Sequence, residues 1–287
     1  MTVRPILHHG NAADVLPLRV SARSVDMVYL DPPFLTQRAW SGPAGSFSDT
    51  WSWGEAAQQD LEAFDQSRRG SSDVLRSLFG SQPPALAFAA AMGRLIGACH
   101  RTLRPTGTLW LHCDDHAAHI FRLLCDIVFG PARFWGTAIW HRSAGANHTT
   151  RSFVRVHDTI LVYLRTGAAL HRLREKAGGT PMTCDGVDGR RLDVFFDDRL
   201  GRSSTERTGY PTQKPVALLS RMIAIASMPG DTVLDACCGS GTTLLAADNM
   251  GRKAIGVDRS ADAIRVARSR FSTPSTFQPD LFGEVMA

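Results

Sequence analysis

A chain of 287 residues with 44% hydrophobic and 21% charged residues has the composition of an ordinary globular protein with a sizeable core. Its formal net charge of +5 suits a polyanionic partner but does not demonstrate one. No apolar stretch approaches the roughly 20 residues that cross a bilayer, the first residues lack the features of a signal peptide, and six scattered cysteines show no C-x-x-C spacing, so we expect a cytoplasmic protein with reduced thiols and no membrane partner.

Short apolar runs alternate along the chain with longer stretches of helical spacing. The runs predict buried strands at 5–8, 25–30, 108–112, 159–164, 232–234 and 254–257. The longer stretches predict helices at 86–103, 116–128, 215–227, 242–250 and 261–270. This alternation indicates an α/β fold, a mostly parallel sheet with helices on both faces.

Two segments interrupt the alternation and divide the chain. Residues 36–84, rich in Gly, Ser, Gln and Trp, predict a loop insertion with one short helix near 55–64. Residues 142–207, rich in Arg and Gly, predict a second insertion around the core strand at 159–164. We therefore expect a domain whose parts are 1–141 and 208–271, followed by a tail at 272–287.

The first motif joins a strand, an acid and a Gly-x-Gly turn to a predicted helix. It reads Asp235-Ala236-Cys237-Cys238-Gly239-Ser240-Gly241-Thr242-Thr243. Glycines let the backbone approach a ligand, and the start of a helix offers free N–H groups to an anion. The next strand ends at Asp258, about 20 residues later, where such folds hold ribose hydroxyls. The motif predicts a nucleoside cofactor without selecting which one.

The second motif, Asp31-Pro32-Pro33-Phe34, directly follows a predicted strand. The prolines fix the backbone and remove two N–H donors, so a carboxylate and bare carbonyls remain beside an aromatic ring. Such a site suits an amino group on a flat ring. Because this nitrogen shares its lone pair with the ring, it is a poor nucleophile, and accepting its hydrogens would favour attack on a sulfonium methyl.

Together these motifs resemble those of the amino-methylating DNA methyltransferases, the N6-adenine/N4-cytosine family. Asp31 to Phe34 is similar to the D-P-P-[YF] motif, and Asp235 to Thr243 is similar to the cofactor loop D-P-F-x-G-S-G-T-T. Tyr210-Pro211-Thr212-Gln213-Lys214-Pro215 resembles the [HY]-P-T-Q-K-P segment. The order of motifs is that of the β class. The resemblance implies a Rossmann-like S-adenosylmethionine-dependent methyltransferase fold, circularly permuted, with a small target-recognition insertion at 142–207.

The resemblance also implies a role for each matching residue. The residues expected to hold the target base are Asp31, Pro32, Pro33 and Phe34. The residues expected around S-adenosylmethionine are Asn11, Ala12, Asp31, Thr212, Lys214, Asp235, Cys237, Gly239, Ser240, Gly241, Thr242 and Asp258. Within this set, Asp258 faces the ribose, and Lys214 lies beside the methionine carboxylate. The chain departs from the family where Ala236 and Cys237 replace Pro-Phe and where Asn11 replaces an acid.

The implied reaction is methyl transfer to N6 of adenine in duplex DNA, and a paired base must be flipped out of the stack to react. Basic and amide side chains in the second insertion suit phosphates and base edges. Those expected to contact DNA are Arg142, Asn147, Arg151, Arg155 and Arg202. The resemblance leaves a homodimer and a cognate restriction enzyme open as partners, and it implies no metal.

Several alternatives stay open. N4-cytosine methylation has the same geometry, although Asp-Pro-Pro is more typical of adenine enzymes. RNA or protein-glutamine methylation fits the motif order less well. A non-catalytic DNA-binding subunit would retain the fold alone, and a nicotinamide oxidoreductase would share the glycine loop. A methyltransferase is stabilised against unfolding by S-adenosylmethionine, whereas an oxidoreductase is stabilised by NAD(H).

Overall fold

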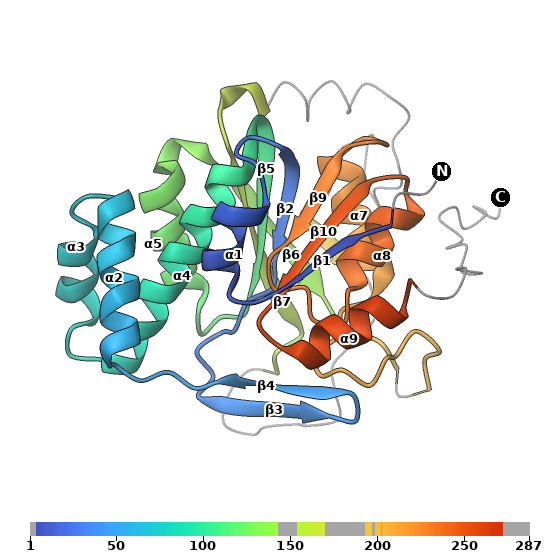
Figure 1. Ribbon diagram of the computed structural model, residues 1–287, viewed down its shortest axis with the longest axis horizontal. Coiled ribbons are helices and arrows are strands. Elements are labelled where there is room, and N and C mark those ends of the chain that lie inside the picture. Colours follow the sequence, from blue (N-terminus) through green and yellow to red (C-terminus); the bar gives the residue numbers. More distant parts are fainter. Residues whose placement is uncertain (1–3, 143–153, 170–192, 197–198, 202, 272–287) are drawn as a thin grey trace.

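The computed structural model describes residues 4–142, 154–169, 193–196, 199–201 and 203–271 (Figure 1). An eight-stranded sheet lies at its centre. The sheet strands are β1 (Ile6–His9), β2 (Val25–Leu30), β5 (Leu103–Cys113), β6 (Phe134–His141), β7 (His157–Leu164), β8 (Val194–Phe196), β9 (Thr232–Asp235) and β10 (Lys253–Asp258). Every predicted strand is present; β2 has the predicted bounds, and the other predicted strands end within a few residues of theirs.

The strand order is β1-β10-β9-β2-β5-β7-β6-β8. β7 runs antiparallel to β5 and β6, and the other neighbouring pairs are parallel. The late strands β9 and β10 fill the space between the early strands β1 and β2. The strand before the glycine loop therefore lies in the middle of the sheet although it comes late in the chain, which is the permuted order that the motifs predicted.

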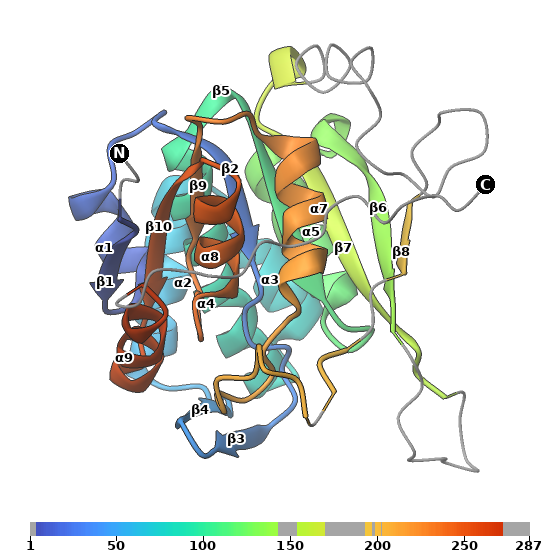
Figure 2. The ribbon, with the colours of Figure 1, turned by 90° about the vertical axis from the view of Figure 1, so that its right-hand side faces the viewer.

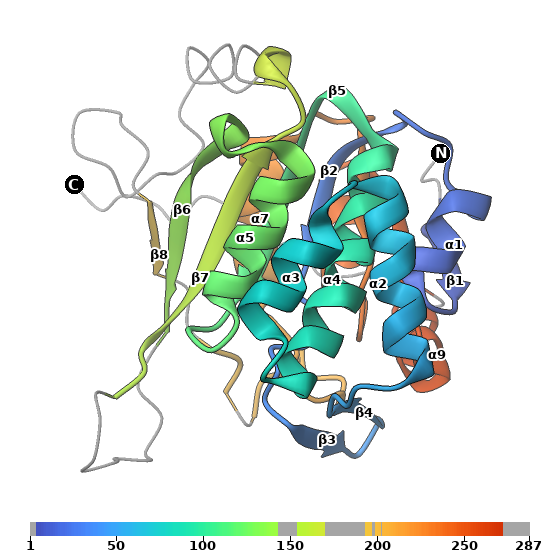
Figure 3. The same ribbon diagram turned by 90° about the vertical axis from the view of Figure 1, so that its left-hand side faces the viewer.

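Helices cover both faces of the sheet (Figures 2 and 3). The helices on one side are α1 (Ala12–Arg19), α2 (Glu55–Ser67), α3 (Ser71–Phe79), α4 (Pro83–Thr102) and α5 (Ala118–Phe129), and those toward the other are α7 (Val216–Ala226), α8 (Thr242–Asn249) and α9 (Ala261–Ser269), with a short 3-10 helix at Pro131–Arg133. Each predicted helix is present. Within the described residues, no helix has the length and apolarity that a membrane span requires.

β2 shows why the core has two layers. All of its residues are buried, as expected for a central parallel strand. Side chains alternate across a strand, so Val28 and Leu30 pack into the core beneath α4 and α5, whereas Met27 and Tyr29 pack into the core beneath α7 and α8. The strand is held from both sides, and its carboxyl end is fixed where Asp31 follows.

The segment 36–84 is more regular than the predicted loop insertion. It contains an antiparallel hairpin, β3 (Arg38–Gly42) and β4 (Gly45–Asp49), and two helices, α2 and α3. α2 buries Leu61 and Phe64, and α3 buries Leu75 and Phe79. The short helix predicted near 55–64 is present as α2, but the hairpin and α3 were not predicted, because α3 buries only a narrow stripe and the hairpin buries only Asp49. In Figure 1 the hairpin lies at the bottom, beside α9.

Candidate active site

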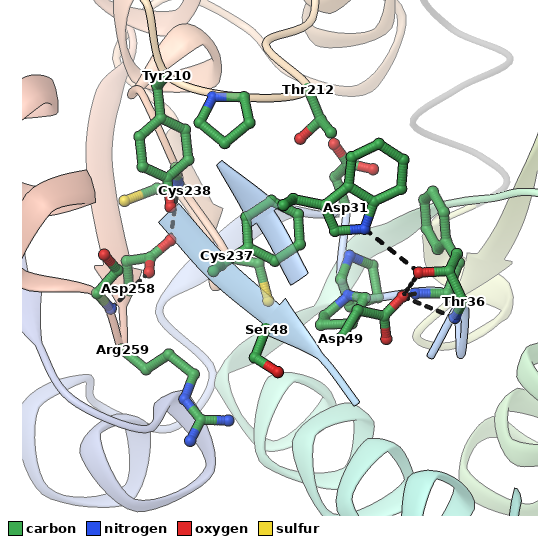
Figure 4. A pocket seen from close by; sticks show the side chains of 18 of the residues that line it. Asp31, Thr36, Ser48, Asp49, Tyr210, Thr212, Cys237, Cys238, Asp258 and Arg259 are labelled. Carbon is green, nitrogen blue, oxygen red and sulfur yellow. Dashed lines mark hydrogen bonds between the residues drawn. The ribbon is translucent and has the colours of Figure 1, made fainter. Parts of the chain in front are cut away.

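A cavity of about 1940 Å³ opens at the carboxyl ends of β2, β9 and β10. Both predicted motifs line it, as do Thr212 and Lys214 of the third segment. Of the residues predicted for the base and the cofactor, Gly241 alone is absent from the lining. Ligand pockets are commonly about 300–1,000 Å³, so this volume admits more than one small group. Figure 4 shows Asp258 and Cys237 on one side of the cavity, with Thr36 and Asp49 on the other.

The glycine loop forms the first side of the cavity. Gly239 and Gly241 have φ values of +49° and +76°, a region that residues with side chains rarely adopt. The backbone N–H of Gly241 donates to Cys238 O at 2.7 Å, and α8 begins at the following residue. The loop therefore presents backbone N–H groups at a helix N-terminus, as the motif predicted.

Asp258 organises this loop as well as facing the cavity. Its Oδ2 accepts the N–H of Gly239 at 2.8 Å, and its Oδ1 accepts the N–H of Ser260 at 2.8 Å. Burial raises the pKa of the Asp258 carboxyl, although these two hydrogen bonds oppose the shift. Each carboxylate oxygen has a further lone pair, so Asp258 can still accept from a ribose hydroxyl.

Asp235 and Cys237 lie deeper on the same side. Asp235 is 3% exposed, and burial raises the pKa of its carboxyl to about 7, against hydrogen bonds from Thr243 and from the Cys237 N–H. Burial, followed by the charges of Asp258 and Asp235, raises the pKa of the Cys237 thiol well above its usual value. Cys237 is therefore a neutral apolar contact where the family has an aromatic residue.

Asn11 has a local role that the sequence did not predict. It is the N-cap of α1, and its side-chain oxygen accepts the N–H of Ala13 at 3.1 Å. Both Asn11 and Ala12 line the cavity, and their contact with the cofactor stays a prediction. The amide oxygen retains a second lone pair for the cofactor adenine.

Asp31 directly follows β2 and lines the cavity (Figure 4). Its Oδ2 accepts a hydrogen bond from the Lys214 ammonium, 183 residues away, and the two groups form an ion pair. Both side chains are mostly buried, with 11% of Lys214 and 18% of Asp31 exposed. Lys214 therefore pairs with the predicted catalytic carboxylate, a partner that the resemblance did not imply.

A buried polar network supports the base side of the cavity. His112, which is fully buried, contacts Tyr29 Oη through Nδ1 at 3.1 Å and Asp158 Oδ2 through Nε2 at 3.2 Å. Burial opposes ionisation of Asp158, but His112 and the charges of Lys214 and Arg142 outweigh it and lower the pKa of this carboxyl to about 2.

Phe34 connects this network to the predicted base site. Its ring lies nearly parallel to that of His112, with an interplanar angle of 13° and centroids 6.3 Å apart. Tyr29, on the other side of His112, has its hydroxyl pKa raised well above the usual value by burial and then by the charge of Asp31. Buried, hydrogen-bonded groups thus lie beside the position where a flat ring would stack.

The predicted DNA contacts are only partly described. Asn147, Arg151 and Arg202 lie outside the described residues. Arg142 lines the cavity, but its side chain is 11% exposed and donates to Asp158 at 2.9 and 3.2 Å. Arg155, also at the cavity, pairs with Asp115 at 3.2 Å. The geometry leaves Arg155 more available to a phosphate than Arg142.

Among the described residues, one group has ligand atoms close enough to hold a metal ion, all within 4.8 Å of one another. It consists of Asp114, Asp115 and His116, two of which are exposed. Arg155 Nη1 lies 3.1 Å from the ring Nδ1 of His116, so a cation already occupies this surface. That no metal takes part stays a prediction.

Two further residues, Asp49 and Trp51, shape the base side and were not among the predicted site residues. Asp49 ends β4 and accepts hydrogen bonds from the turn after Phe34. Trp51 lines the cavity, packs edge-on against Phe88 with ring centroids 5.1 Å apart, and donates its indole N–H to Asp49. The alternation of Trp51 and Trp53 was the only sequence signal, and it fitted ordinary packing equally well.

The sequence has clear relatives. The type II methyltransferase M2.LlaDCHI of Lactococcus lactis subsp. cremoris is 24% identical over 277 residues, which are 95% of this chain and 91% of the relative. The DNA adenine methyltransferase YhdJ of Escherichia coli K12 is 25% identical over 296 residues, with 96% of this chain and 86% of the relative covered.

Solved structures share the fold. TTHA0409 of Thermus thermophilus, a candidate DNA modification methylase crystallised with S-adenosyl-L-methionine, aligns with a TM-score of 0.58 at 20% identity over 93% of each chain. The cytosine-N4-specific PvuII DNA methyltransferase aligns with a TM-score of 0.60 at 15% identity, over 97% of this chain and 89% of its own. The sequence profile of the N6/N4 DNA methylases matches residues 25–269, which include all three motifs. This chain therefore belongs to the N6/N4 family of DNA methylases.

Proposed function

We propose that this DNA methyltransferase transfers a methyl group from S-adenosylmethionine to N6 of adenine in duplex DNA. The observation that carries the proposal is the convergence of Asp31, Phe34 and the glycine loop on one cavity. The name of YhdJ, a DNA adenine methyltransferase that aligns with 96% of this chain, favours adenine. Work on DNA also fits the cytoplasmic location that the sequence predicts.

The cavity residues fit S-adenosylmethionine, which supplies an electrophilic sulfonium methyl. The glycine loop and Thr242 would surround the methionine part, and Asp258 would accept from the ribose. Burial raises the pKa values of the Asp235 and Asp258 carboxyls, and a positively charged ligand beside them would favour their ionised forms. Lys214 would give its ammonium to the methionine carboxylate or keep it on Asp31.

The chain's own groups would activate the amine. Asp31 and the Pro32 carbonyl accept the two hydrogens of the flipped adenine, and Phe34 stacks on its ring. With its lone pair localised, the nitrogen would be able to attack the sulfonium methyl that S-adenosylmethionine supplies, and the thioether would leave with the electrons of the broken carbon–sulfur bond. The methylated nitrogen then loses one proton, for which Asp31 is the nearest acceptor in this scheme.

The second candidate is N4-cytosine methylation, because the cytosine-N4-specific PvuII enzyme shares the fold. The exocyclic amine of cytosine would meet the same acceptors. Geometry at Asp31 does not separate the two bases, so the product must be identified directly.

The test is transfer of labelled methyl groups to duplex DNA, single-stranded DNA and RNA of mixed sequence, followed by nucleoside mass spectrometry. N6-methyladenine from duplex DNA is the expected product. N4-methylcytosine would support the second candidate, and label in RNA alone would contradict a DNA substrate. No label in any substrate, with S-adenosylmethionine bound, would support a non-catalytic subunit.

A further inference from the structure

Asp49 lies at the end of the hairpin strand β4, outside both motifs, and is 1% exposed. Its Oδ2 accepts the N–H of Phe34 at 3.2 Å and the N–H and hydroxyl of Thr36 at 2.8 and 2.6 Å. Its Oδ1 accepts the N–H of Leu35 at 3.1 Å and the indole N–H of Trp51 at 2.7 Å. Since all five groups donate, the carboxyl group acts only as an acceptor, which is the behaviour of a carboxylate.

The turn that Asp49 holds is strained. Leu35 and Gln37 have φ values of +60° and +54°, a region that residues with side chains rarely adopt. Such residues persist where the surrounding structure over-determines them, and they cluster at active sites. Asp49 fixes the amides at 34–36, and the Gln37 side chain is bonded to both backbone groups of Trp51, at 2.8 and 3.2 Å.

This strained turn is continuous with the catalytic tetrapeptide. Phe34 contributes both a backbone N–H to Asp49 and a ring to the cavity. Figure 4 shows Asp49 and Thr36 facing each other at the edge of the cavity that also contains Asp31. The Asp31 carboxylate and the Phe34 ring therefore move together if the 34–36 turn moves.

We propose that Asp49 is a positioning residue for the transfer reaction, one that holds the 34–36 turn so that Phe34 and Asp31 keep their geometry toward the base. The kinetic consequence of this role rests on the proposed function, whereas its structural consequence, the fixed turn, does not. Asp49 contacts neither base nor cofactor in this role. It acts through the turn, so its removal affects the chemical step rather than cofactor affinity.

Asp26 offers a matched control. It is also 1% exposed. Its side chain accepts the N–H of Thr232 at 3.0 Å and forms an ion pair with Arg104 at 3.3 Å. It lies near the start of β2, at the opposite end of the strand from Asp31. Asp26→Asn and Asp49→Asn thus make the same change to equally buried carboxylates, and only Asp49 touches the turn.

Hydrogen exchange measured by mass spectrometry tests the structural part without any activity. In Asp49→Ala, the amides of residues 34–36 are expected to exchange at least about tenfold faster than in the wild type, because each loses its acceptor. In Asp26→Asn these amides keep the wild-type rate. Unchanged exchange in Asp49→Ala would overturn the proposal. If Asp49→Ala does not fold, the same exchange rates are measured in Asp49→Asn and in Thr36→Val, which removes the hydroxyl that donates to Asp49.

Kinetics tests the functional part. Asp49→Ala is expected to lower kcat by about 100-fold, the scale of a misplacement of about 1 Å, with the Kd for S-adenosylmethionine within twofold of the wild type. Asp49→Asn, which keeps one acceptor oxygen, restores part of kcat, and Asp26→Asn keeps kcat while lowering Tm. If Asp49→Ala has a kcat within threefold of the wild type although its 34–36 amides exchange faster, the proposal is overturned. An inactive wild type would instead overturn the proposed function, and the exchange rates would still decide whether Asp49 holds the turn.

Discussion

The two sides of the cavity are built in different ways. The cofactor side is largely local: Asp235 accepts from Cys237, the turn closes between Cys238 and Gly241, and the helix follows at once. The base side depends on distant residues. Asp31 pairs with Lys214, 183 residues away, and Tyr29 contacts His112, 83 residues away. A loop held by its own residues and by the nearby Asp258 therefore faces a catalytic segment whose partners lie much farther away in the chain.

The largest expected effect separates the two sides by function. Asp31→Ala should lower kcat by about 1,000-fold, within the range for a lost proton acceptor, while the cofactor side still binds S-adenosylmethionine. Labelled methyl transfer and isothermal titration calorimetry measure the two quantities, with Asp31→Asn as the control that keeps one acceptor. A cofactor Kd that worsens as much as kcat would show that the two sides are not separable.

The cofactor side should carry its own pH dependence. Burial raises the pKa of Asp235 to about 7 from an ordinary 3.8, so the folded chain holds this proton more tightly than the unfolded chain. The stability contributed by this proton is present near pH 4 and is lost as pH rises to about 7, and each pKa unit corresponds to about 1.4 kcal/mol.

Asp235→Asn has no proton to lose at this position. The free energy of unfolding is measured by urea denaturation without cofactor. Between pH 4.5 and 7.5, the difference between Asp235→Asn and the wild type should therefore shift by several kcal/mol in favour of the variant. Parallel curves for the two proteins would contradict a buried carboxyl that ionises near neutral pH.

Lys214 joins the two sides, so its replacement sharpens the comparison. Lys214→Met leaves the largely buried carboxylate of Asp31 without its cation. A hydrogen bond to a charged group contributes about 2 kcal/mol, so kcat/KM should fall by about 30-fold. Lys214→Arg, which keeps the charge, should recover most of it. Equal kinetics for Lys214→Met and the wild type would remove Lys214 from the site.

The smallest expected effect compares two glycines of one loop. A Cβ at Gly241 would lie 2.9 Å from the Cβ of Ala267 in α9, whereas a Cβ at Gly239 would have 3.4 Å to the Tyr210 ring. Both have positive φ, which costs about 1–2 kcal/mol for a residue with a side chain. Gly241→Ala should therefore destabilise more than Gly239→Ala in urea denaturation. The reverse order would mean that α9 yields easily.

Local pattern explains how much of this could be predicted. The glycine loop, the Asp31 to Phe34 segment and the alternating strands and helices were predicted because each is a contiguous stretch whose chemistry shows in its own residues. The order of the motifs added the permuted sheet, and the family profile confirms the resemblance. Most of the predicted cofactor and base residues line one cavity.

What could not be predicted depends on residues far apart in the chain. Nothing in the sequence around Asp49 shows that its carboxylate accepts from a turn 13–15 residues earlier. The partner of Lys214 could not be predicted either. Asp31 and the expected methionine carboxylate are both anions, so charge alone does not select between them, and the partner is set by packing. The hairpin was missed because Asp49 is its only buried residue, and α3 was missed because it buries only a narrow stripe, Ser71, Leu75 and Phe79.

The pairing of β1 with β10 has a consequence for how the protein is made. β1 leaves the ribosome long before its partner β10 (Lys253–Asp258), because most of the described chain lies between them. Until β9 and β10 emerge, β1 and the near edge of β2 expose unpaired backbone groups, which invite pairing with other chains. During synthesis, β1 and β2 are therefore present for a long interval without β9 and β10, the two strands that lie between them in the sheet. Chains halted before β9 should aggregate rather than accumulate as folded fragments.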